Sequence, residues 1–128
     1  ERRVVVITGD GEMVRGVGAM ATIGAQRPDN LAVVVGDNER YGETGMQLTH
    51  TAGGVDLPAM ALAAGFESAA SVSSDNEFKA ALPAIRNAKG PGFWSIKIRA
   101  EGNPIGVMPP KDGVTLKDRF RAALLGVA

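Results

Sequence analysis

The chain has 128 residues, of which 45% are hydrophobic, so it can form one domain with a real core and is too short to expect two. Lysine plus arginine equals aspartate plus glutamate, at 14 each, which argues against a nucleic-acid-binding protein with an overall basic field. No apolar run reaches the length of a membrane span, and the absence of cysteine is compatible with a cytoplasmic location.

The first half of the chain alternates strand-like and helix-like segments. The β-branched run at residues 3–8 predicts a fully buried strand of a parallel sheet, because such strands are covered on both faces. Residues 12–26 predict a helix whose many glycines imply close packing on the sheet or on a partner chain. Residues 31–35 predict a second buried strand. The glycine-rich stretch 39–56 has no clear period and predicts a long functional loop.

Two further helices are expected after that loop. Asp56 is placed to cap a helix that carries Pro58 in its first turn and ends near Gly65. Residues 76–88 predict a helix capped by Ser74 and Asp75. Its inward-facing residues are expected to be Phe78, Leu82 and Ile85.

The remaining segments complete an alternating pattern. Residues 66–72 predict a short strand, and residues 93–98 alternate in a way that predicts a strand with one wetter face. A Gly/Pro-rich loop is expected at 100–114, followed by an amphipathic helix at 115–126 with Leu116, Phe120 and Leu124 on one side. Together these elements predict one doubly wound α/β domain over residues 1–128, with a mostly parallel sheet and helices on both of its faces.

Polar residues follow the first two predicted strands at their carboxyl ends. Gly9-Asp10-Gly11 comes after the first strand, and Asp37-Asn38 after the second. Ligands of open α/β sheets bind at that edge. A carboxylate, an amide oxygen and a loop carbonyl are oxygen ligands of the kind that Mg²⁺ prefers. Gly11 permits close approach of the backbone, and the N–H groups opening the next helix favour phosphate, so the pattern predicts a metal-bound diphosphate.

The spacing of these motifs resembles a known signature. Gly-Asp-Gly and Asp-Asn, separated by residues 12–36, are similar to the thiamine-diphosphate motif. The stretches 11–24 and 37–51 narrow the resemblance to the diphosphate-binding part of sulfopyruvate and phosphonopyruvate decarboxylases, of the beta-subunit type. The resemblance implies the thiamine-diphosphate-binding fold, with thiamine diphosphate and Mg²⁺ as cofactors. It also implies decarboxylation of a small anionic 2-oxo acid to an aldehyde.

The resemblance also assigns roles to individual residues. It places Asp10, Asn38 and the backbone carbonyl of Arg40 on the metal ion, and it directs the backbone N–H groups of Glu12 and Met13 toward the diphosphate. The residues expected to contact the cofactor are Gly9, Asp10, Gly11, Glu12, Met13, Asn38, Tyr41, Gly42 and Thr44. His50, the only histidine, is the candidate for a catalytic role, since it could bind an anionic group or transfer a proton.

Simpler interpretations exist for the same residues. Asp10 could cap the following helix, and Asn38 could be an ordinary turn residue. Glu12 could serve only the helix dipole. Tyr41, Gly42 and Thr44 could pack the loop. His50 is more commonly explained as a surface residue.

Parts of the expected active site are not recognisable in this sequence. In the related enzymes, the groups that bind the cofactor's amino group and bend the cofactor lie well before Gly-Asp-Gly. Only eight residues precede Gly9 here. The glutamate that activates the cofactor belongs to a separate pyrimidine-binding domain. The resemblance therefore implies a hetero- or homo-oligomer completed by such a domain or subunit, or by N-terminal residues absent from this sequence.

Two other functions remain open on the sequence. The first is a different thiamine-diphosphate enzyme, of the benzoylformate decarboxylase or acetolactate synthase type, which would keep the same metal motif. The second is a non-catalytic assembly module with the same fold. The module predicts no magnesium-dependent cofactor binding.

Overall fold

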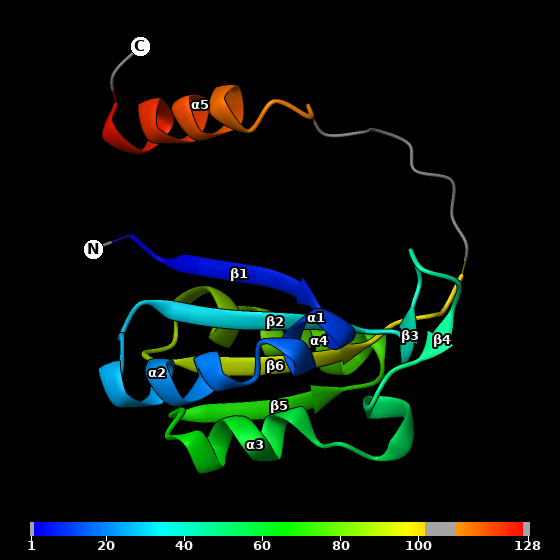
Figure 1. The fold of residues 1–128 in the computed structure, drawn as a ribbon. Coiled ribbons are helices and arrows are strands. Elements are labelled where there is room, and N and C mark those ends of the chain that lie inside the picture. The colour runs from blue at the N-terminus through cyan, green and yellow to red at the C-terminus, as the bar shows by residue number, and fades with distance from the viewer. Residues whose placement is uncertain (1, 102–109, 127–128) are drawn as a thin grey trace.

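The computed structural model describes residues 2–101 and 110–126, and a four-stranded parallel sheet lies at its centre (Figure 1). The strand order is β1-β2-β6-β5. In chain order, the elements are β1 Val4–Gly9, α1 Asp10–Arg15, α2 Gly18–Gln26, β2 Leu31–Asp37, β3 Arg40–Tyr41, β4 Gln47–Leu48, the short 3-10 helix η1 Thr51–Gly53, α3 Leu57–Ala64, β5 Ser68–Val72, α4 Asp75–Asn87, β6 Gly92–Lys97 and α5 Gly113–Leu125.

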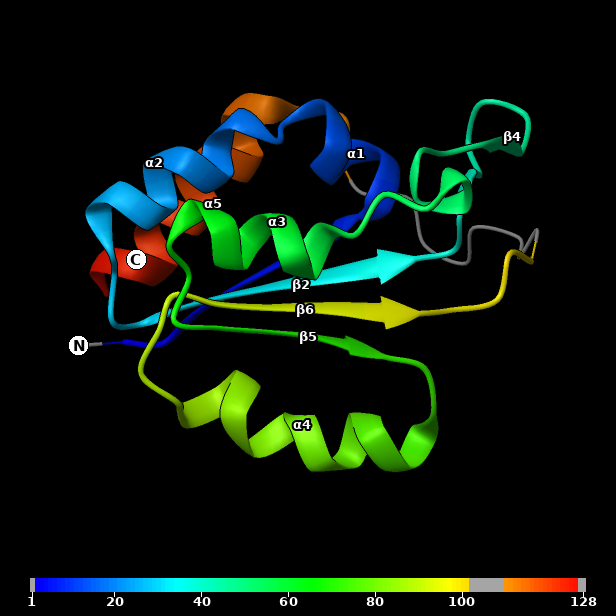
Figure 2. The ribbon, with the colours of Figure 1, turned by 90° about the horizontal axis from the view of Figure 1, so that it is seen from below.

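Helices cover both faces of the sheet. Helices α1, α2 and α3 lie on one face and α4 on the other (Figure 2). Alternate residues of the central strands enter the two cores: Val33 and Phe93 join the first, while Ala32 and Trp94 join the second. The predicted doubly wound α/β fold is therefore confirmed.

The prediction of a fully buried first strand is wrong. Val4, Val5 and Val6 are each more than 40% exposed, and Ile7 is 79% exposed. β1 lies at the edge of the sheet and pairs with β2, whereas α4 packs on β2, β5 and β6. A β-branched run indicates a strand of a parallel sheet, but it does not say whether that strand lies in the centre or at an edge.

The single helix predicted at 12–26 is divided into α1 and α2. Gly16 ends α1 with a non-helical backbone, and the chain re-enters a helix after Val17. Glycine loses more conformational freedom in a helix than any other residue, so a break at this position costs little. The break lets α1 contact β1 and β2 while α2 packs on α3.

Close packing explains one of the glycines of α2, Gly24. Gly24 is buried, and a Cβ atom there would lie 2.7 Å from the carbonyl carbon of Ala64 at the end of α3. The predicted close approach therefore exists, but its partner is a neighbouring helix instead of the sheet.

The expected helix caps at α3 and α4 are confirmed. Asp56 accepts a hydrogen bond from the Ala59 N–H at 3.0 Å, and Ser74 accepts one from the Glu77 N–H at 3.3 Å. Of the residues expected to point inward from α4, Ile85 is buried, Leu82 is half-buried and Phe78 is 38% exposed. Phe78 lines a hollow together with Val34 and Ile96 of the sheet, so it faces the sheet as predicted, although it is not buried.

The strand predicted at 93–98 is confirmed as β6, but its wetter face is not. Ser95 is only 3% exposed, and Phe93 and Trp94 are buried as well. β6 lies between β2 and β5, and α3 and α4 pack on its two faces, so both faces are covered. The strand predicted at 66–72 is β5, and Phe66 before it packs edge-on against Phe93 with ring centroids 5.9 Å apart.

The last helix forms close to the predicted position, and Asp112 caps it. None of the described residues of α5 is buried; Phe120 is 69% and Leu124 is 51% exposed. The Arg2 guanidinium donates a hydrogen bond to the Leu124 carbonyl at 3.1 Å. Most of the loop predicted at 100–114 lies outside the described residues.

The segment predicted as a long loop contains a small hairpin. β3 and β4 pair antiparallel, and η1 follows them. Figure 1 shows this hairpin beyond the carboxyl ends of the parallel strands. Within residues 2–101 and 110–126, no helix combines the length and apolarity needed to cross a membrane.

Candidate functional site

A cleft of about 590 Å³ lies at the carboxyl edge of the sheet, between α1 and the hairpin. The ends of β1 and β2 deliver Asp10 and Asn38 to it, and Arg40 at the start of β3 lines it as well. The parallel pairing of β1 with β2 brings these residues together, because Gly9 is the register partner of Gly36. The structure thus collects all three residues expected at the metal in one cleft.

Most of the residues expected at the cofactor line this cleft. They are Gly9, Asp10, Gly11, Glu12, Asn38, Tyr41, Gly42 and Thr44. The side chain of Met13 is instead 8% exposed and belongs to the core, which leaves only its backbone available to a ligand. His50 is exposed and is not among the residues that line the cleft. Its predicted catalytic role stays a prediction.

Asp10 is a buried carboxylate, not a helix cap. The cap of α1 is Gly9, which makes no side-chain capping bond, so the simpler interpretation of Asp10 is wrong. Asp10 is 2% exposed, and the hydroxyl groups of Thr49 and Thr51 donate hydrogen bonds to its Oδ2 atom. A buried carboxylate without such donors would be strongly unfavourable. The loop after the hairpin therefore organises this side chain.

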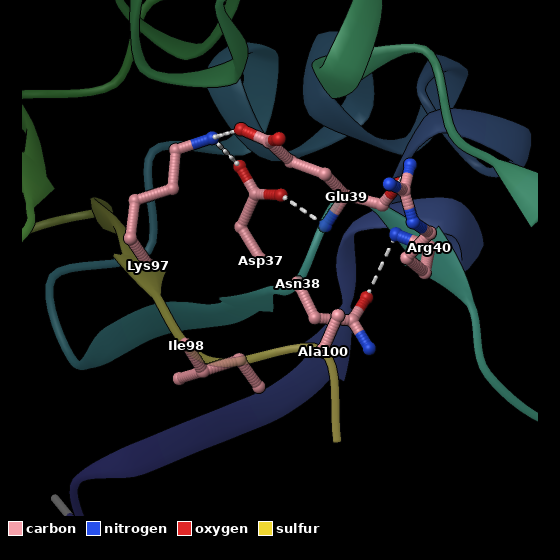
Figure 3. A pocket seen from close by; sticks show the side chains of 7 residues that line it. All are labelled: Asp37, Asn38, Glu39, Arg40, Lys97, Ile98 and Ala100. Atoms are coloured by element: carbon pink, nitrogen blue, oxygen red, sulfur yellow. Dashed lines mark hydrogen bonds and ion pairs between the residues drawn. The ribbon is translucent and has the colours of Figure 1, made fainter. Parts of the chain in front are cut away.

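Asn38 stabilises the turn that carries Arg40. Its Oδ1 atom accepts a hydrogen bond from the Arg40 N–H at 2.9 Å (Figure 3). This geometry is the turn conformation that asparagine favours, so the turn interpretation of Asn38 is correct and is compatible with a place at the cleft.

The donor set suits a hard cation. One carboxylate, one amide oxygen and one backbone carbonyl are oxygen donors of the type that Mg²⁺ takes alongside phosphate and water. The described residues contain no group of three or more His, Cys, Asp or Glu side chains able to hold a metal ion. The ligand set expected here has only one acidic side chain, that of Asp10, so it would not form such a group.

Tyr41 joins the hairpin to α1. A Cβ atom on Gly11 would lie 2.7 Å from the Cδ1 atom of the Tyr41 ring, so only glycine fits beneath the ring in this arrangement. The Arg15 guanidinium lies 5.8 Å from the centroid of the same ring, and both residues line the cleft. Tyr41 therefore has two roles: it packs the loop against α1, and it lines the cleft. Arg15, which the sequence analysis did not select, adds a positive charge at the cleft.

Glu12 lies at the cleft with its side chain exposed. Its Oε2 atom accepts a hydrogen bond from the Thr8 hydroxyl at 2.6 Å. The side chain therefore links the end of β1 to the first turn of α1, in addition to its favourable position near the helix dipole.

Thr49 and Thr51 are site residues that the sequence analysis missed. They flank His50, and their hydroxyl groups point toward Asp10 and lie 2.9 Å from each other. The Thr51 hydroxyl oxygen also lies 2.8 Å from Asp37 Oδ1, so its single hydrogen is shared between the two carboxylates. No local signal marks these threonines, because their contacts with Asp10 join residues 39 and 41 positions apart.

Lys97 pairs with two carboxylates beside the cleft. Its Nζ atom lies 2.8 Å from Asp37 Oδ2 and 2.6 Å from Glu39 Oε1 (Figure 3). Partial burial disfavours the charged amine, but the hydrogen bonds and the attraction of both carboxylates outweigh it, so the pKa of Lys97 lies above its usual value. These residues also line a smaller hollow of about 350 Å³.

The parallel sheet and the polar cleft at its carboxyl edge place the protein among the ligand-binding doubly wound α/β domains. Comparison with known families narrows this class. The family described as thiamine pyrophosphate enzyme, C-terminal TPP binding domain, matches residues 1–96, and the chain belongs to it. The resemblance seen in the sequence is thereby confirmed.

Individual relatives agree with that family. The chain is 37% identical to the phosphonopyruvate decarboxylase of Streptomyces viridochromogenes over 122 residues, which cover 94% of this chain and 30% of the relative. It is 39% identical over 85 residues to sulfopyruvate decarboxylase subunit beta of Methanocaldococcus jannaschii, covering 64% and 45%. The corresponding subunit of Methanothermobacter thermautotrophicus is 38% identical over 99 residues, covering 77% and 50%. The chain thus spans half or less of each relative's length.

Proposed function

We propose that this chain is the diphosphate-binding part of a thiamine-diphosphate- and Mg²⁺-dependent decarboxylase that converts a 2-oxo acid to an aldehyde. The family and the similarity to phosphonopyruvate and sulfopyruvate decarboxylases support this proposal. The observation that carries it is the convergence of Asp10, Asn38 and Arg40 on one cleft at the carboxyl edge of the sheet. The substrate would be sulfopyruvate or phosphonopyruvate, each an anionic 2-oxo acid.

In this proposal the chain's own residues anchor one end of the cofactor. Asp10, the Asn38 amide oxygen and the Arg40 carbonyl hold Mg²⁺, and the backbone N–H groups of Glu12 and Met13 donate to the diphosphate. Arg15 adds a cation at the same cleft. When bound, thiamine diphosphate would supply a thiazolium ring that takes up the electron pair left on the substrate carbon when CO₂ departs. The protein contributes anchoring and orientation.

We also propose a partner for the other end of the cofactor. The relatives from Methanocaldococcus jannaschii and Methanothermobacter thermautotrophicus are named as beta subunits, which supports assembly with a second subunit or domain that binds the pyrimidine ring. The exposed apolar side chains of β1 and α5 offer area for such a contact, since Ile7 and Phe120 are 79% and 69% exposed. His50 remains a candidate for contact with the substrate or for proton transfer once the partner is in place.

The proposal is tested by calorimetric titration of thiamine diphosphate with Mg²⁺ into the chain assembled with its pyrimidine-binding partner. Asp10→Asn keeps the size of the side chain and removes its charge, so magnesium-dependent binding should disappear. Asp29→Asn, at an exposed turn, is the matched control and should bind as the unaltered protein does. Absence of magnesium-dependent binding in the demonstrably assembled unaltered protein would support the non-catalytic module instead.

The reaction is then identified from its products. Release of CO₂ and a free aldehyde from sulfopyruvate or phosphonopyruvate is the expected result. Turnover of benzoylformate, or formation of a new carbon–carbon bond, would assign the chain to another thiamine-diphosphate enzyme. Each substrate is measured beside Asp10→Asn to exclude a contaminating activity.

A further inference from the structure

Lys97 lies at the carboxyl end of β6, next to the carboxyl end of β2. It is the last residue of β6, and its register partner across the sheet is Asp37, the last residue of β2. Side chains of register partners share one face of a sheet and lie close together. The Lys97 amine contacts Asp37 and Glu39 at 2.8 and 2.6 Å, and Figure 3 shows it between the two carboxylates.

The second carboxylate belongs to a residue with an uncommon backbone conformation. Glu39 has φ +59°, in the left-handed region that residues with a Cβ atom rarely adopt. It lies between Asn38 and Arg40, two of the residues proposed to hold the metal ion, so its backbone conformation affects the course of the chain from one to the other. Its backbone is held on both sides, because its N–H donates to Asp37 Oδ1 at 3.1 Å and its carbonyl accepts a hydrogen bond from the Thr49 N–H at 3.1 Å. The pairing of its carboxylate with Lys97 restrains its side chain as well.

Through other side chains, Lys97 is also linked to Asp10, which follows the end of β1. Asp37 is 3% exposed, and its Oδ1 atom accepts a hydrogen bond from Thr51, whose hydroxyl oxygen also lies 3.0 Å from Asp10 Oδ2. A continuous set of contacts therefore runs from Lys97 through Asp37 and Thr51 to Asp10. Lys97 itself is not among the residues lining the larger cleft, so it acts through its neighbours.

We propose that Lys97 is a positioning residue for the metal site: it holds Glu39 in its left-handed conformation and Asp37 in place, and thereby sets the affinity for Mg²⁺. This inference rests on the proposed function. Without the amine, the carboxylates of Asp37 and Glu39 would repel each other, and Glu39 would lose the contact that restrains its side chain. The turn carrying Asn38 and Arg40 would then relax away from the geometry that binds the ion.

The first test measures the Mg²⁺ concentration that gives half-maximal binding of thiamine diphosphate to the assembled protein. Lys97→Met should raise this concentration about tenfold, the lower end of the effect of losing a direct partner of a metal ligand, because Lys97 contacts neighbours of the ligands and not the ligands themselves. Binding at saturating Mg²⁺ should stay close to that of the unaltered protein. Lys97→Arg keeps the charge and should stay within about threefold on the same scale. Lys79→Met, at an exposed position of α4, should change nothing.

A rescue experiment separates the backbone effect from a loss of charge. Glycine adopts positive φ freely, so Glu39→Gly in the Lys97→Met background should restore most of the Mg²⁺ affinity. Glu39→Gln in that background removes the same charge but keeps the Cβ atom, and it should not restore the affinity. If the two double variants have the same Mg²⁺ affinity, Lys97 does not act through the backbone conformation of residue 39, and the inference is overturned.

The possible failures are distinguishable. If the unaltered protein shows no magnesium-dependent binding, the proposed function fails, and this inference fails with it. If the unaltered protein binds but Lys97→Met has the same Mg²⁺ midpoint, only the inference is overturned. A variant that unfolds at a lower temperature while keeping the midpoint would likewise show a structural role alone and overturn the inference.

Discussion

At the scale of single residues, the site depends on two buried carboxylates that share one hydroxyl group. Asp10 and Asp37 are 2% and 3% exposed, and the Thr51 hydroxyl lies between them. Burying a carboxylate is favourable only when charged or hydrogen-bonding partners replace water. Thr49 and Lys97 supply further partners, so both side chains remain satisfied.

Thr51→Val tests this arrangement, because valine has the shape of threonine without the hydroxyl group. We expect the free energy of unfolding to fall by about 1–3 kcal/mol, the usual contribution of hydrogen bonds to charged groups, while Thr49 and the Glu39 N–H keep the two carboxylates partly satisfied. The measurement is urea denaturation at neutral pH. Thr44→Val removes an exposed hydroxyl that bonds to Gln47 and should change stability by less than about 0.5 kcal/mol. Equal losses in the two variants would contradict the explanation.

Whether each of these residues could be predicted depends on whether a nearby stretch of the sequence marks it. Asp10 and Asn38 could be predicted because each directly follows an apolar strand, and parallel strands end at one edge. Thr49, Thr51 and Lys97 could not, since Thr49 and Thr51 lie 39 and 41 positions from Asp10, and Lys97 lies 58 positions from Glu39. No short stretch of sequence specifies which distant side chain meets a buried carboxylate.

At the scale of elements, glycine has two different uses in adjoining helices. Gly16 allows the break between α1 and α2, whereas Gly24 allows α2 to approach the end of α3. Gly18, the first residue of α2, has no neighbouring atom within 4 Å of where a Cβ would lie. The same residue type therefore reflects a break, a close contact and no visible packing requirement within nine positions.

A matched pair of substitutions distinguishes these uses. Gly24→Ala places a methyl group against the backbone of Ala64 and should destabilise the protein by about 1–3 kcal/mol, the usual effect of overpacking. Gly18→Ala should leave stability unchanged or raise it by up to about 1 kcal/mol, because alanine is the better helix former. The two midpoints of urea denaturation give the comparison. A stable Gly24→Ala variant would show that α2 and α3 can separate at little expense.

At the scale of the whole molecule, the stable body is the sheet with the helices α1 to α4. The members of both buried clusters come from residues 13–94, and α5 contributes none. α5 instead contacts the N-terminal segment through the hydrogen bond from Arg2 to Leu124. The apolar side chains of β1 and α5 remain exposed in the described parts of the chain.

Removal of the C-terminal segment tests whether the body is independent of α5. A chain ending at Glu101 should unfold with a free energy within about 0.5 kcal/mol of the full chain, since no described residue of α5 is buried. Leu57→Ala is the contrasting variant: Leu57 is 1% exposed, and its truncation should cost about 2–5 kcal/mol. A comparable loss on removing α5 would mean that the helix packs on the body in solution.

By itself, the sequence determined the class of fold, the order of the four strands of the parallel sheet along the chain, and the residues that follow β1 and β2. These features depend on local patterns: apolar runs, capping residues such as Asp56 and Ser74, and a motif of fixed spacing. Only the tertiary structure decided that β1 is an exposed edge, that β6 is central, and that Lys97 meets Asp37. The physical reason is that strand order and side-chain pairing depend on contacts between distant segments, whereas the local patterns report only whether a segment is a strand, a helix or a turn.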